Sequence, residues 1–153
     1  NLVISLLMIR IDYPPHDFRI RKEPESEFIF DEFCKRWVRL TPEEWVRQNF
    51  LQYLSRVKKY PLSLIAVEKE IMLGELKKRF DILVYDQQHR PWMMIECKAM
   101  EVELSEEVLQ QVLRYSITIP APYLIITNGS YCAAWQKVNG QLAEQSALPD
   151  WGL

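Results

Sequence analysis

Two apolar segments, RFDILVY at residues 79–85 and WMMIECK at residues 92–98, indicate neighbouring β-strands. A short polar connection with one proline separates them, as in a hairpin. Charged residues interrupt both segments: Asp81 in the first, Glu96 and Lys98 in the second. An acid in an apolar strand is costly unless it pairs or binds a cation. These three side chains are therefore the first candidates for a functional site.

Strand geometry predicts how these candidates are arranged. Side chains alternate along a strand, so Glu96 and Lys98 share one face and Cys97 points into the core. If the two strands pair, Asp81 and Glu96 converge. Two carboxylates are suited to Mg²⁺, with Mn²⁺ as an alternative ion, and such an ion lowers the pKa of a bound water. Lys98 would orient that water and stabilise charge on a phosphate. This constellation predicts phosphodiester hydrolysis.

The surrounding pattern predicts a mixed α/β sheet flanked by helices, in one domain spanning residues 1–153 with its core at about residues 28–138. Thr41 and Pro42 mark a helix start, and Ser105 marks another. The expected elements are a hairpin at 28–31 and 37–40, a helix to about Lys58, strands at 62–71, 79–85 and 92–98, a helix to about Ile117, strands at 123–127 and 131–138, and a weakly structured tail.

Composition limits the function classes. The chain has 153 residues, 48% hydrophobic and 26% charged, and no apolar run of about 18 residues that a membrane span requires. Three scattered cysteines indicate reduced thiols, and we expect a cytoplasmic protein. The net charge is −2, yet residues 35–79 hold 11 Lys/Arg against 5 Asp/Glu. Within that basic stretch, the best predicted phosphate contacts are Lys77, Lys78 and Arg79.

The aspartate of the first segment and the ECK of the second, in this order of elements, resemble the PD-(D/E)XK nuclease superfamily. The resemblance implies a restriction-endonuclease-like α-β-β-β-α-β core whose acids bind a divalent metal for DNA cleavage. Gln111 and Tyr115 match its QxxxY spacing, one helical turn apart, and would position the site or the DNA backbone. A third acid often joins from the first helix: Glu44 fits by position, and Glu68 is the competitor.

More closely, the stretch from Phe28 to Gly129, about two thirds of the chain, is similar to the nuclease domain of the type I restriction enzyme R protein. LTPEEWVR at 40–47 and IECKA at 95–99 carry this similarity. Phe80 stands where the superfamily has proline before its aspartate. We expect no helicase motor, because 153 residues cannot hold one and no phosphate-binding Walker loop is present.

The sequence therefore predicts a Mg²⁺-dependent DNA endonuclease-like domain. The alternative is a catalytically silent nuclease-fold module that binds nucleic acid or docks onto a restriction-modification or helicase subunit. RNA is a third, weaker candidate substrate. Since cutting both strands generally requires two active sites, a homodimer or a partner subunit is also expected.

Overall fold

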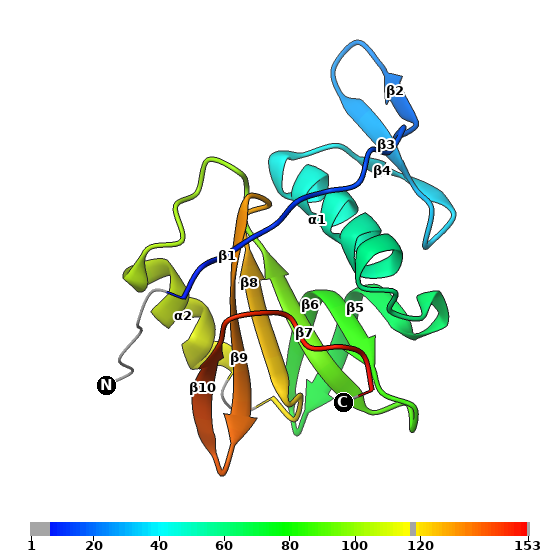
Figure 1. The fold of residues 1–153 in the computed structure, drawn as a ribbon. Helices are drawn as coiled ribbons and strands as arrows, with labels where there is room; N and C mark the ends of the chain where they lie inside the picture. Colours follow the sequence, from blue (N-terminus) through cyan, green and yellow to red (C-terminus); the bar gives the residue numbers. More distant parts are fainter. Residues whose placement is uncertain (1–6, 117–118, 153) are drawn as a thin grey trace.

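The computed structural model describes residues 7–116 and 119–152. Within them lie two α-helices, a seven-stranded mixed sheet and a three-stranded antiparallel sheet (Figure 1). Apolar residues of the first helix pack on one face of the large sheet, and those of the second helix pack on the other. The predicted mixed α/β class, with helices on both faces of the sheet, is confirmed.

Five strands of the large sheet lie in the order β9-β8-β7-β6-β5, and β5 forms one edge. The pairs are antiparallel except for β7 with β8, which are parallel and joined through helix α2. Every residue of β8 is buried, which explains its largely apolar sequence, and the hydroxyl of its last residue, Thr127, donates to the carbonyl of Tyr131 at 2.9 Å. The bounds are β5 Ile65–Leu73, β6 Leu76–Tyr85, β7 Pro91–Cys97, β8 Tyr123–Thr127 and β9 Tyr131–Val138.

Helix α1 (Pro42–Gln52) starts as predicted, with the Thr41 hydroxyl accepting a hydrogen bond from the backbone of Glu44 at 3.1 Å. A π-helical turn, η1 (Tyr53–Val57), extends it almost to the predicted end. Helix α2 spans Glu106–Ser116, and the predicted final residue, Ile117, lies outside the described residues. No helix in the described part of the chain is long and apolar enough to cross a membrane.

The small sheet contains the predicted hairpin, β3 (Glu27–Asp31) with β4 (Arg36–Arg39), and a third strand, β2 (Ile20–Lys22), that the sequence did not reveal. A two-residue strand, β1 (Ile9–Arg10), pairs with β9 at the edge of the large sheet and was also missed. Both missed strands are too short to show a period of their own.

Two predictions are wrong. Residues 62–64 form a 3₁₀ turn, η2 (Leu62–Leu64), after Pro61, instead of starting a strand. The tail is not weakly structured, because β10 (Gln141–Gln145) pairs with β9 and Leu148 is buried. Beyond it, the Tyr60 hydroxyl donates to the carbonyl of Pro149 at 2.6 Å, and the Trp151 indole donates to the carbonyl of Tyr85 at 3.1 Å. Burial and long-range pairing order this polar sequence.

Candidate active site

The carboxylate of Asp81 lies against the backbone that joins Glu96 to Lys98. Its Oδ2 accepts a hydrogen bond from the amide of Cys97 at 2.8 Å. The paired part of β6 and β7 stops one residue before Asp81 and Glu96, so these two acids are next in register. Cys97 itself is buried on the α1 face, as the alternation predicted.

The alternation of β6 is interrupted at Asp81. Phe80 packs with α2 and Ile82 packs with α1, although a regular strand would place both on one face. Across β5, Glu68 occupies the position opposite Asp81 and has a φ of 49°, in the left-handed region that is unusual for a strand residue. The two strands therefore deviate together at the level of the candidate site.

A cavity of about 110 Å³ on the α2 face is lined by Glu96, Lys98 and Gln111. Lys78 of β6 also lines it. The structure thus brings together four residues that were predicted from separate patterns. Tyr115 lies on the same helix, but its side chain is outside the described part of the structure.

The other two predicted phosphate contacts point elsewhere. Lys77 pairs with Glu70 of β5 at 3.3 Å, and Arg79 pairs with Glu68 at 2.8 Å. Both basic side chains are more than half exposed. They flank the candidate site on the β5–β6 hairpin without lining the cavity of Glu96.

On the α1 face, Asp81 lines a second cavity, of about 340 Å³, together with Glu44, Glu68 and Arg47. Arg47 donates hydrogen bonds to both of these glutamates, at 2.8 Å to Glu68. Both candidates for the third acid are therefore next to Asp81, and both are bound by one guanidinium. Sequence analysis did not identify Arg47 as a site residue. The signal that could have identified it is a basic residue three positions after Glu44, on the buried side of the same helix.

The two central acids have raised pKa values in the folded protein. Burial raises the pKa of Glu96 to about 7, and the charge of Asp81 adds to this effect while Lys98 and Lys78 oppose it. Burial also raises the pKa of Asp81, against the lowering effects of the Cys97 amide and of nearby cations. A cation that neutralises this pair would make their joint ionisation easier.

Two carboxylates of the candidate site, those of Asp81 and Glu96, could serve as ligands of Mg²⁺. No described residue donates a hydrogen bond or ion pair to Oδ1 of Asp81 or to the carboxylate of Glu96. Mg²⁺ in proteins is commonly held by one or two carboxylates, with water and substrate phosphate completing its shell. Across residues 7–116 and 119–152 there is no cluster of three or more His, Cys, Asp or Glu side chains arranged for a metal. Among the predicted acidic site residues, Asp81 and Glu96 are the two whose side-chain oxygens are not bound by Arg47.

A family model described as "Type I restriction enzyme R protein N terminus" matches residues 42–149. The matched segment runs from the first residue of α1 past β10. It therefore includes every predicted site residue from Glu44 to Tyr115. A comparison with curated proteins found no match.

Proposed function

Because the chain belongs to the family of the type I restriction enzyme R protein N terminus, we propose that it is a Mg²⁺-dependent deoxyribonuclease domain with a restriction-endonuclease-like core. The observation that carries this proposal is the 2.8 Å hydrogen bond from the Cys97 amide to Asp81. It supports a shared role for Asp81, Glu96 and Lys98, since one acid contacts the backbone between the other two residues.

Each residue has a distinct role in the proposed reaction. Asp81 and Glu96 would hold Mg²⁺ or Mn²⁺, and the bound ion would supply Lewis-acid polarisation and a water of lowered pKa. Glu96 would take this role in its ionised form, which a bound cation would favour against the burial that raises the pKa of the metal-free carboxyl to about 7. The ammonium of Lys98 would orient the attacking water and neutralise charge developing on the phosphate.

The remaining predicted residues would bind DNA. Gln111 lines the cavity of Glu96 and would donate from its amide to the DNA backbone. Lys78 lines the same cavity, while Lys77 and Arg79 extend along β6 as contacts to flanking phosphates. The three cysteines are free thiols, and this supports our proposal that the protein acts in the cytoplasm.

Plasmid cleavage tests this function. Supercoiled DNA is incubated with the protein and Mg²⁺, Mn²⁺ or EDTA, and nicked and linear products are quantified. We expect cleavage with either metal and none in EDTA, and a loss of roughly 10²-fold or more in Asp81→Asn, Glu96→Gln and Lys98→Met. Asp17→Asn is the matched control because Asp17 is exposed and lines neither cavity of the candidate site. Equal cleavage by all variants would identify a contaminating nuclease and overturn the proposal.

One observation favours the alternative function, a silent module that binds nucleic acid or docks onto a motor or restriction-modification subunit. Arg47 neutralises Glu44 and Glu68, so neither acid is available to a cation while this ion-pair network persists. The module would bind DNA in a salt-dependent manner without cleaving it, and Mg²⁺ would not raise its melting temperature.

Sedimentation with and without DNA tests the expected homodimer.

A further inference from the structure

The small sheet presents a face rich in arginine and aromatic side chains. Side chains alternate along strands, so the small sheet has two faces. One face carries Ile29, which is fully buried, and the arginine and aromatic side chains lie on the opposite face. We call the opposite face the Arg-aromatic platform. Its six residues, two from each strand or its entry, are Arg19, Arg21, Phe28, Phe30, Trp37 and Arg39.

The rings hold two of the arginines in place. The Arg19 guanidinium lies 4.6 Å from the ring centre of Phe30 and 5.4 Å from that of Trp37. The Arg21 guanidinium lies 4.9 Å from the same Trp37 ring and 5.2 Å from Phe28. All four distances are within the range of cation–π attraction. Arginines fixed in this way lose less side-chain freedom when they bind a ligand.

The platform has an excess of positive charge. Glu23 pairs with Arg21 at 3.2 Å, and both side chains are about half exposed. Arg19 and Arg39 are exposed and make no ion pair with any residue that the structure describes. Two uncompensated guanidinium groups beside three rings are complementary to a ligand that combines negative charge with flat aromatic groups.

The platform also reaches the candidate active site. Arg39, the last residue of β4, lines the 340 Å³ cavity that contains Asp81 and Glu68. A polymer lying on the platform would therefore approach Asp81 along β4. This continuity links the platform to the proposed DNA substrate.

We propose that the Arg-aromatic platform binds a single-stranded segment of the DNA substrate next to the active site, an inference that rests on the proposed function. Unpaired bases stack on aromatic rings and on guanidinium planes, while their phosphates pair with arginine. Duplex DNA keeps its bases stacked inside the helix and would use only the phosphate contacts. The three rings of the platform therefore favour a single strand over a duplex.

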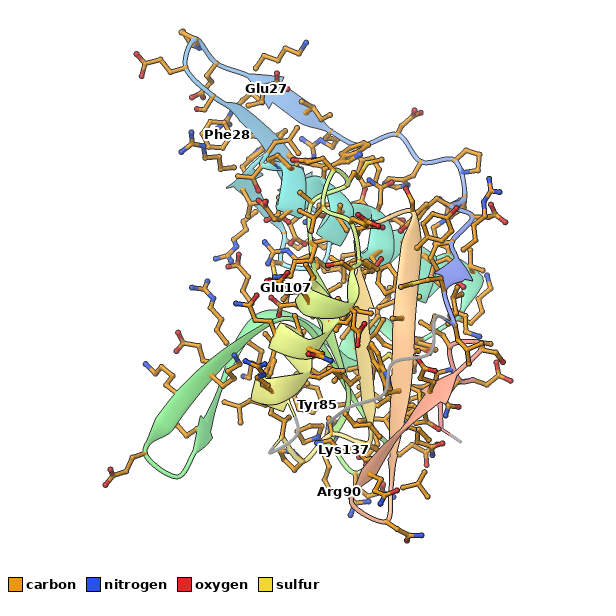
Figure 2. All side chains as sticks on the ribbon, turned by 90° about the vertical axis from the view of Figure 1, so that its left-hand side faces the viewer. Glu27, Phe28, Tyr85, Arg90, Glu107 and Lys137 are labelled. Atoms are coloured by element: carbon orange, nitrogen blue, oxygen red, sulfur yellow. The ribbon has the colours of Figure 1, made fainter. Side chains whose placement is uncertain are left out.

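Binding of a labelled single-stranded oligonucleotide of about 15 nucleotides, and of the matching duplex, tests this inference by fluorescence anisotropy in EDTA. EDTA separates binding from metal-dependent cleavage. We expect Phe28→Ala and Arg21→Ala each to weaken single-strand binding about tenfold and duplex binding less than threefold. Arg90→Ala is the matched control because Arg90 is 72% exposed and lies at the opposite end of the molecule from Phe28 (Figure 2).

Arg21→Lys keeps the charge and the fold while removing the planar group, so we expect it to lose most of the single-strand preference and keep the salt dependence. Equal losses for single strand and duplex would overturn the inference in favour of a phosphate-binding surface. Unchanged binding in all platform variants would also overturn it and leave a partner protein as the occupant. If platform variants lose single-strand binding and the protein shows no metal-dependent cleavage, the platform is a single-strand-binding surface, while the nuclease proposal and the role of the platform in holding a substrate both fail.

Discussion

Arg47 of α1 donates a hydrogen bond to the carboxylate of Glu68 on β5 at 2.8 Å. Its side chain is only 9% exposed and also pairs with Glu44, which is 6% exposed. These acids raise the pKa of Arg47 despite the opposing effect of its burial. In return, although partial burial raises the pKa of Glu68, Arg47 and Arg79 outweigh it and lower that pKa. The network joins the helix to the sheet beside Asp81.

Removing Arg47 should be far more costly than removing Arg79. Arg47→Ala leaves Glu44 buried without its charged partner and with the Gln48 amide as its remaining side-chain donor, and we expect the free energy of unfolding to fall by about 3–5 kcal/mol. Arg79→Ala removes a 61% exposed partner of the same Glu68, so about 1 kcal/mol or less is expected. Urea denaturation measures both changes. Similar values for the two variants would contradict the distinct roles of these arginines.

Stability should depend on pH through Glu96, whose pKa is raised from 4.5 to about 7 in the folded protein. Between these values the native state holds more protons than the unfolded state, so the free energy of unfolding falls as the pH rises and levels off above about 7. Urea titrations across this range in wild type and Glu96→Gln measure the contribution. The variant should lose this part of the pH dependence.

Added Mg²⁺ should act in the opposite direction. Since it binds the ionised carboxylates, we expect it to raise the melting temperature more at about pH 8 than at about pH 5.5. Asp81→Asn should show neither increase. An equal effect of Mg²⁺ at both pH values, or its persistence in Asp81→Asn, would argue against metal binding at this pair.

The ordered tail should contribute to stability. Leu148 is 5% exposed, and its truncation in Leu148→Ala should cost about 2–5 kcal/mol. Tyr60→Phe removes the hydrogen bond to Pro149 and should cost about 1 kcal/mol. Val138→Ala, at a side chain 46% exposed, is the control and should change stability by less than about 1 kcal/mol. A tail that does not stabilise the fold would make all three variants alike in thermal melts.

Gly129 should tolerate a side chain less well than Gly140. Both have positive φ, 95° and 75°, so alanine is strained at either position by about 1 kcal/mol. Only at Gly129 would the new Cβ come within 3.3 Å of Val46 and 3.4 Å of Met100. We therefore expect Gly129→Ala to cost about 1–2 kcal/mol more than Gly140→Ala in denaturant melts. Equal costs would show that the Val46 side chain simply moves.

Local sequence predicted the parts of the fold that depend on local pattern. The buried strand Tyr123–Thr127 was predicted to the residue because its sequence, YLIIT, is a short and largely apolar run that the Asn128-Gly129 turn ends. The convergence of Glu96, Lys98 and Gln111 followed from strand alternation and family resemblance. By contrast, local sequence could indicate the pairing of Arg47 with Glu44 on the same helix but not its bond to Glu68, which comes from a different element. The irregular backbone at Asp81 likewise depends on tertiary packing and not on residue type.

The pairing of β1 with β9 has a consequence for the order of folding. Ile9 pairs with Cys132, and the Tyr13 hydroxyl donates at 2.5 Å to the carbonyl of Gly129, 116 positions further along the chain, so two segments distant in sequence meet (Figure 1). Such distant contacts are slow to form because a long loop must close before they can stabilise the chain. During synthesis this segment must therefore wait until β9 leaves the ribosome. The segment that contains β1 is then placed over α1 late in the folding of the domain.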